Sequence, residues 1–88
     1  MTEPSVKRYA LAYEAVRAFY DDCTLCSYNY GDILNDLLRR PYYVLECVKF
    51  VGRDYHLDRY PESSFQEESY YKYKDAVTKL KDYIEGLN

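Results

Sequence analysis

A pair of cysteines separated by two residues, in Cys23-Thr24-Leu25-Cys26, is the one short motif in this sequence that is associated with chemistry. In redox proteins such a pair normally begins a helix, where the helix dipole lowers the thiol pKa. Here the pair follows a predicted helix and comes directly after Asp21 and Asp22, and both features disfavour a thiolate. We therefore do not expect thiol–disulfide chemistry of the thioredoxin type.

Zinc binding is the other chemistry that these cysteines could support. The four residues that could form a Cys3His ligand set are Cys23, Cys26, Cys47 and His56. The second half of this set lacks the close spacing of a ligand pair, and Cys47 falls on the apolar face of its predicted helix. Because free cysteine is commonly buried as a small apolar residue, we predict no metal and no other cofactor. A zinc-stabilised domain is the alternative.

Catalytic groups are scarce in the sequence. His56 is the only histidine, and no motif places a nucleophile or an orienting carboxylate beside it. The three glycines are isolated, so there is no glycine-rich phosphate loop. Adjacent carboxylates such as Glu67 and Glu68 point about 100° apart on a helix, which does not suit an acid–base pair. We expect a protein that is not an enzyme.

Tyrosine is the anomaly of the composition, with 13 residues against three phenylalanines and no tryptophan. Five tyrosines fall on the apolar faces of predicted helices and are assigned to the core: Tyr9, Tyr13, Tyr20, Tyr73 and Tyr83. Six others do not fall on such a face: Tyr28, Tyr30, Tyr42, Tyr55, Tyr60 and Tyr71. Tyrosine and arginine are enriched among the residues that dominate protein interfaces. The surplus therefore favours a binding surface, although some tyrosines could instead cover the small core.

The predicted partner-binding surface combines most of these tyrosines with the arginines interleaved among them. Its members are Tyr28, Tyr30, Arg39, Arg40, Tyr42, Arg53, Tyr55, Arg59 and Tyr60. We expect segments 28–30, 39–43 and 53–60 to lie together in the folded protein. The predicted partner is a larger protein, and by analogy alone the function is that of an inhibitor, regulator or immunity protein docking on it. A homodimeric structural protein is the alternative.

Charge and hydropathy restrict the other partners. A net charge of −3 with dispersed basic residues argues against nucleic acid, which needs clustered lysine and arginine. A nucleic-acid contact would require the arginines to gather near tyrosines on which bases could stack. No apolar run approaches the length of about 20 residues that spans a bilayer, and residues 1–4 lack the features of a signal peptide. Three cysteines without framework spacing suit a reducing cytosol, so we expect a cytoplasmic protein without a membrane partner.

The elements that position these residues are predicted to be helices. The strongest signal runs from Ser64 to Leu87, where apolar residues recur at i, i+3, i+4 and i+7. That helical face consists of Phe65, Ser69, Tyr73, Ala76, Val77, Leu80, Tyr83, Ile84 and Leu87, of which only Ser69 is neither apolar nor aromatic. Ser64 and Glu67 have the spacing of a capping box, and Gly86 is expected to end the helix in a left-handed conformation.

The remaining chain predicts three further helices. One begins at Pro4 and ends near Cys23, and a second, capped by Asp32, ends before Pro41. In the second helix we expect four apolar residues to face inward: Ile33, Leu34, Leu37 and Leu38. Segment 42–51 is rich in strand-forming residues but has a helical apolar period, so we predict a helix closed by Gly52 and keep a strand as the alternative.

The predicted fold is a single all-α domain over residues 1–88, a small bundle of three or four helices. The expected helices span about 4–23, 32–40, 41–52 and 64–86. The first and last helices are expected to form the principal packed pair, because both carry long apolar stripes. The residues expected to share the core are Val16, Tyr13, Phe19, Val77, Leu80 and Ile84.

Overall fold

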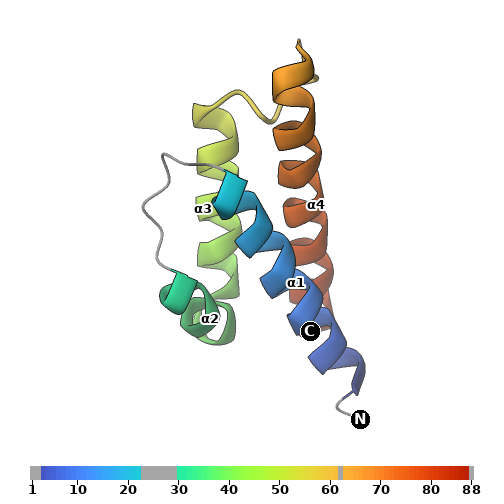
Figure 1. Ribbon diagram of the computed structural model, residues 1–88. Helices are drawn as coiled ribbons and strands as arrows, with labels where there is room; N and C mark the ends of the chain where they lie inside the picture. Colours follow the sequence, from blue (N-terminus) through green and yellow to red (C-terminus); the bar gives the residue numbers. More distant parts are fainter. Residues whose placement is uncertain (1–2, 23–29, 62, 88) are drawn as a thin grey trace.

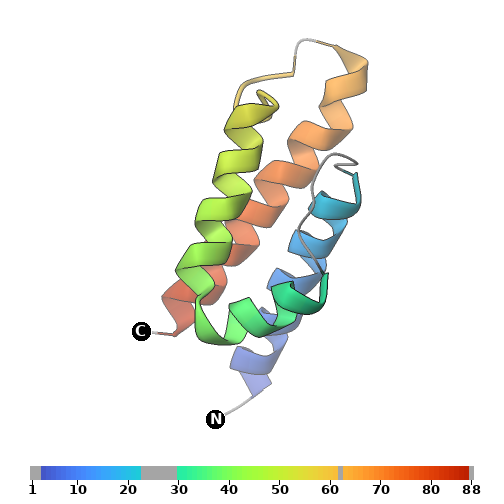
Figure 2. The same ribbon diagram turned by 90° about the vertical axis from the view of Figure 1, so that its left-hand side faces the viewer.

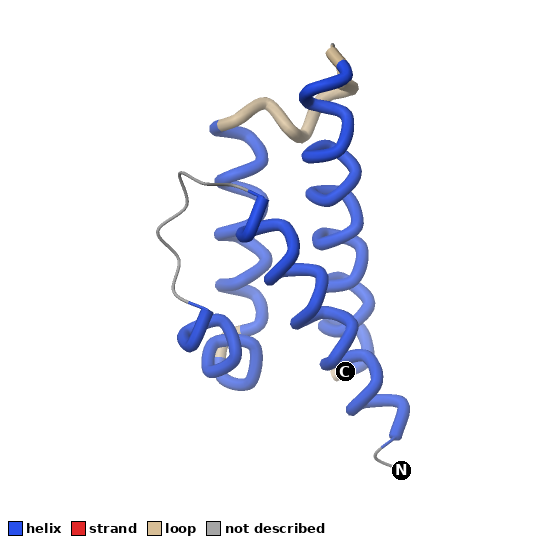
Figure 3. Tube along the Cα trace, viewed as in Figure 1, coloured by secondary structure: helices blue, strands red, loops and turns tan. Residues whose placement is uncertain are grey.

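Four helices make up the computed structural model, which describes residues 3–22, 30–61 and 63–87. They are α1 (Glu3–Asp22), α2 (Tyr30–Arg39), α3 (Pro41–Asp54) and α4 (Ser64–Gly86), shown in Figure 1. The described residues contain no strand (Figure 3). The prediction of an all-α bundle is confirmed, and segment 42–51 is helix. No described helix is both long enough and apolar enough to cross a membrane.

The three longer helices run along the length of the molecule, whose longest dimension is 43 Å. Figure 2 shows α4 behind α3 and α1, both of which pack against it, while the short α2 crosses from α1 to the start of α3 at one end. The most extensive contact between helices joins α1 to α4, as predicted. The segment that links α3 to α4 lies at the other end of the molecule (Figure 1).

The core draws on all four helices. Its largest fully buried side chains are Phe19, Ile33, Leu37, Leu80, Val16, Val44 and Val48. Of the six residues predicted to share the core, Val16, Phe19, Leu80 and Ile84 are buried. The remaining two, Tyr13 and Val77, are half-buried and pack against its edge. The apolar spacing of the first and last helices therefore identified the centre of the bundle correctly.

Two tyrosine hydroxyls attach α2 to the long helices. Tyr83 of α4 donates a hydrogen bond to the Leu37 carbonyl at 3.1 Å, and Tyr9 of α1 donates to the Leu34 carbonyl at 3.5 Å. Burial raises the pKa of Tyr83 above its ordinary value of 10.0, so this hydroxyl remains protonated and able to donate at neutral pH. The rings of Tyr9 and Tyr83 also meet edge to face, 5.8 Å apart. These contacts fix the position of α2 across the end of the bundle.

The predicted bounds of α4, 64–86, are confirmed, but both of its predicted caps require correction. The residue that precedes the helix is Ser63 in an extended conformation, with no side-chain capping hydrogen bond, so the predicted capping box of Ser64 and Glu67 is wrong. Gly86 is the last residue of the helix, and the capping residue after it, Leu87, has right-handed backbone angles. A Cβ at Gly86 would meet only the side chain of Arg8 from α1, which is flexible and can move aside.

The end of α3 is closed by a left-handed histidine, two residues beyond Asp54. His56 has φ of 59°, its N–H donates to the Arg53 carbonyl at 3.2 Å, and the N–H of Leu57 donates to the Gly52 carbonyl at 2.6 Å. These two bonds form a Schellman motif, and Leu57 is buried behind it. The prediction that Gly52 closes this helix is wrong, because Gly52 lies inside α3.

Replacing His56 by glycine is expected to raise the free energy of unfolding by about 0.5–1 kcal/mol. The left-handed conformation costs an L-residue about 1–2 kcal/mol, and glycine avoids this cost. The larger conformational entropy of glycine in the unfolded chain offsets only part of the stability gained. Urea denaturation followed by circular dichroism measures the change. The control is His56→Ala, which removes the same side chain and keeps the strain, so it should not stabilise. A glycine variant no more stable than the alanine variant would contradict this account.

Candidate partner-binding surfaces

The predicted partner-binding residues do not form one surface in the described structure. Three of them lie at the junction of α2 and α3: Arg39, Arg40 and Tyr42. Four lie at the end of α3 or just after it: Arg53, Tyr55, Arg59 and Tyr60. The 14 residues of α3 separate the two groups by about 20 Å, and Figure 1 shows them at opposite ends of the molecule. Each group is therefore considered as a separate site.

The other tyrosines divide between core and surface. Tyr28 lies outside the described residues, and of Tyr30 only the backbone, at the start of α2, is described. Tyr55 is half-buried and packs against the core, so it covers the core and is not a free contact residue. Tyr70, which the sequence left unassigned, is buried and contacts the rings of Tyr60 and Tyr71. Its position three residues before Tyr73 on α4 was the signal that could have placed it on the inner face.

The junction of α2 and α3 exposes a group of large apolar side chains. This corner surface consists of Leu34, Leu38, Arg39, Tyr42 and Tyr43, all of which are exposed. The prediction that Leu34 and Leu38 face inward is wrong. On a ten-residue helix that touches the bundle along one face, Ile33 and Leu37 take the buried positions, and residues 34 and 38 point about 100° away.

Arg40 holds this corner in a fixed shape. Its guanidinium donates to Asp36 Oδ1 through Nη2 at 3.0 Å and through Nε at 3.3 Å, and its backbone N–H donates to the Asp36 carbonyl at 2.6 Å. The guanidinium carbon also lies 4.2 Å from the centre of the Tyr43 ring, a cation–π contact. A hydrogen bond with Cys47 raises the pKa of Tyr43 above its ordinary value. Arg40 is therefore committed to the junction, and Arg39 is the arginine that faces outward.

The alternative zinc site would use four residues, of which the structure describes two. Cys23 and Cys26 lie outside the described residues. Cys47 is half-buried on α3, and His56 is exposed after its end. Within residues 3–22, 30–61 and 63–87, no group of three or more histidine, cysteine, aspartate or glutamate side chains could hold a metal ion.

Two residues of the second group, Arg59 and Tyr60, border a small open pocket of 240 Å³, here called the loop pocket. It is lined by His56, Arg59, Tyr60 and Gln66. The first three follow the end of α3, and Gln66 belongs to the first turn of α4. The left-handed turn at His56 brings the chain back toward α4, which is how residues ten apart come to share one pocket. Each of the four side chains can donate a hydrogen bond.

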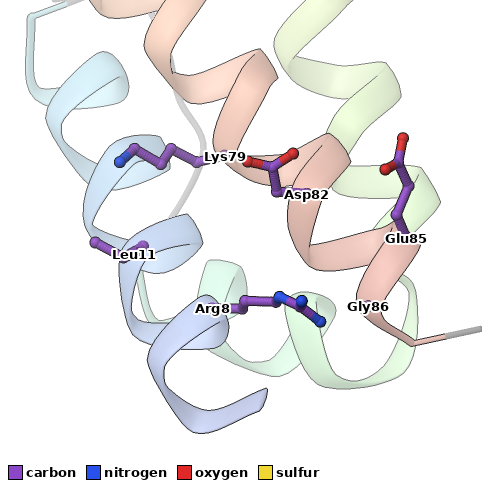
Figure 4. A pocket seen from close by; sticks show the side chains of 6 residues that line it. All are labelled: Arg8, Leu11, Lys79, Asp82, Glu85 and Gly86. Atoms are coloured by element: carbon purple, nitrogen blue, oxygen red, sulfur yellow. The ribbon is translucent and has the colours of Figure 1, made fainter. Parts of the chain in front are cut away.

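A larger hollow of 440 Å³ lies between α1 and α4 (Figure 4). Its lining residues are Arg8, Leu11, Lys79, Asp82, Glu85 and Gly86. The Arg8 side chain reaches across to Gly86, and Lys79 extends toward α1. Because the lining carries two basic and two acidic side chains, the hollow favours neither sign of charge in a ligand. It is the weaker candidate for a binding site.

Known proteins provide no assignment for these surfaces. Comparisons of this chain with protein-family models, with curated proteins and with solved structures find no match.

Proposed function

We propose that this protein binds a larger protein through the corner surface and regulates or inhibits that partner without catalysing a reaction. The observation that carries the proposal is the exposure of apolar side chains on a rigid junction of two helices. Leu38 and Tyr42 are 66% and 59% exposed, and Leu34 and Tyr43 beside them are also exposed. Large exposed apolar patches mark sites of association, and these four side chains lie within ten residues of one another around a single helix junction.

The corner also has the composition of an interface centre. Tyrosine supplies a large contact area with few rotatable bonds, and tyrosine and arginine are the residues that most often dominate binding energy. Phe50 extends the surface, because it is exposed and lies seven residues, or two turns, beyond Tyr43 on the same flank of α3. The fixed geometry of Arg40 reduces the ordering cost of association.

The partner that fits this surface is a protein with an apolar groove bordered by a carboxylate. The apolar groove would receive Leu38 and Tyr42, and the carboxylate would pair with Arg39, which has no ion pair among the described residues. A second copy of the chain fits less well. A symmetric dimer would bring both Arg39 side chains into one interface, where like charges oppose association.

Replacing Tyr42 by alanine is expected to weaken partner binding by about 1–2 kcal/mol, or roughly five- to thirtyfold, because truncation removes an exposed contact residue. Affinity capture from a cell extract after nuclease treatment identifies the partner, and titration calorimetry measures both affinities. The matched control is Tyr71→Ala, since Tyr71 is a tyrosine of similar exposure, 54%, on a different helix. It should change affinity less than about twofold.

Three results would contradict this function. Equal losses from the Tyr42 and Tyr71 variants would remove the corner surface as the site. A partner lost on nuclease treatment, with affinity that falls steeply as salt rises, would indicate nucleic acid. A dimer detected by light scattering that the Tyr42 variant dissociates would show that the corner serves self-association. Circular dichroism of both variants establishes that neither change has unfolded the bundle.

A further inference from the structure

We propose that the loop pocket binds the phosphoryl group of a small phosphate monoester, at a site separate from the corner surface. The first observation is the chemistry of its lining. Among the described residues that border it are an arginine, a histidine, a tyrosine and a glutamine, and no carboxylate. All four side chains donate hydrogen bonds, and arginine presents a planar fork that matches two phosphoryl oxygens. A pocket of donors recognises a group rich in acceptors.

The charge of Arg59 is available to a ligand. Arg59 forms no ion pair with any described residue, although Asp58 is its neighbour in the chain. The Asp58 carboxylate lies near Tyr73, where it adds to the effect of burial in raising the pKa of that tyrosine. Arg53, the other arginine at this end, also lies near Tyr73 and does not line the pocket. Arg59 is therefore the cation that a ligand would meet.

His56 occupies a position that favours glycine. Its left-handed backbone carries a cost that a glycine would avoid, yet the residue present has a side chain, and that side chain lines the pocket. Strained backbone conformations that persist in folded proteins cluster at binding sites. In the proposed site the imidazole would contribute a hydrogen bond to the ligand, and it lines the same pocket as Arg59.

Tyr60 supplies a surface for the organic part of the ligand. Tyr60 is 77% exposed, and its ring contacts the ring of Tyr70 with 5.9 Å between centres. Tyr70 is itself fixed by burial and by a hydrogen bond from Lys74 Nζ at 3.2 Å. A planar group attached to the phosphate can stack on the open face of Tyr60. At 240 Å³ the pocket lies below the usual range of about 300–1,000 Å³, which favours a small ester over a large cofactor.

The test is a titration with inorganic phosphate and with phenyl phosphate, followed by the backbone amide NMR signals of the full chain. Chloride added at equal ionic strength is the reference, because it screens charge without offering phosphoryl oxygens. We expect saturable shifts in residues 56–66 with both phosphates and none with chloride. Phenyl phosphate should bind more tightly than inorganic phosphate, because its ring can stack on Tyr60.

The two arginines at this end form a matched pair of variants. Arg59→Gln is expected to weaken binding of both phosphates by about tenfold or more, since a hydrogen bond to a charged group is lost. Arg53→Gln removes the same charge from a neighbouring position outside the pocket and should change affinity less than about twofold.

His56→Gly should weaken phosphate binding several-fold although it is expected to stabilise the fold. A histidine with a purely structural role would not produce this combination. Tyr42→Ala at the corner surface should leave phosphate binding unchanged.

Other outcomes would overturn the proposal. Equal losses from the Arg59 and Arg53 variants would show general attraction between charges in place of a site. Shifts that fail to saturate, that chloride reproduces, or that centre on the hollow between α1 and α4 would place no phosphate in the loop pocket. Unchanged affinity in the glycine variant would remove His56 from the site. None of these results depends on whether the corner surface binds a protein, so the two proposals fail separately.

Discussion

Replacing Leu80 by alanine is expected to lower the free energy of unfolding by about 2–5 kcal/mol. Leu80 is fully buried on α4, the helix that makes the most extensive contact in the bundle. Truncation removes apolar contact and leaves a cavity, because α1 on the facing side cannot fully close over the gap. Since domains of this size have total stabilities of about 5–15 kcal/mol, the variant is expected to be partly unfolded at room temperature or unfold on mild heating.

The control for Leu80 is the same substitution at an exposed leucine. Leu34→Ala removes an equal side chain from the corner surface, where Leu34 is exposed and leaves no cavity. It should change stability by less than about 0.5 kcal/mol. Urea denaturation of both variants, with circular dichroism at the helix band, measures the difference. Similar losses from the two leucines would show that the bundle does not pack around Leu80.

Replacing Gly52 by alanine is expected to destabilise the protein by about 1–3 kcal/mol. A Cβ at this position would lie 2.5 Å from Cζ and 2.7 Å from Cδ1 of the Tyr73 ring, far inside contact distance. The ring cannot move aside freely, because Tyr73 is buried in the core and packs against Phe19 with 5.7 Å between ring centres. The alanine variant therefore forces α3 and α4 apart.

The direction of the stability change in Gly52→Ala distinguishes a glycine required by close helix packing from an ordinary helical glycine. Inside an exposed helix, glycine to alanine normally stabilises by about 1 kcal/mol. Gly86→Ala provides the comparison, since the Cβ there would meet only the flexible side chain of Arg8, which can move into solvent. Thermal unfolding should therefore show Gly52→Ala melting below the parent protein and Gly86→Ala at or above it. A stabilised Gly52 variant would contradict the close approach of α3 and α4.

The order and type of the helices could be predicted because local signals and apolar spacing agreed. Pro41 and the stripe around Leu80 each restrict the chain over a few residues, and the structure follows them. The predicted cap at Asp32 is wrong, because α2 begins at Tyr30 and Asp32 lies inside its first turn. The positions and caps of the helix ends were harder to predict from the sequence. A histidine in the left-handed position of the α3 terminus has no sequence signal, and Gly52 reads as a helix end although its role is to admit the Tyr73 ring.

The candidate sites could be predicted in composition but not in arrangement. The sequence predicted that segments 39–43 and 53–60 lie together, but the length of α3 between them sets them about 20 Å apart. The exposure of Leu34 and Leu38 could not be predicted, because all four apolar residues of α2 have the same sequence character. Only the direction in which α2 crosses the bundle decides which pair is buried.

The dominance of the α1–α4 contact affects how the protein folds as it is synthesised. About 40 residues separate these helices, so the ribosome needs roughly 2–8 s to make the intervening chain. During that time Val16 and Phe19 on α1 lack their main partner and are open to chaperones or aggregation. The junction of α2 and α3 needs only contacts between residues three or four apart, such as Arg40 with Asp36 and Tyr43. These local contacts of the corner can form before α4 is made, whereas the core, which needs α1 and α4 together, cannot.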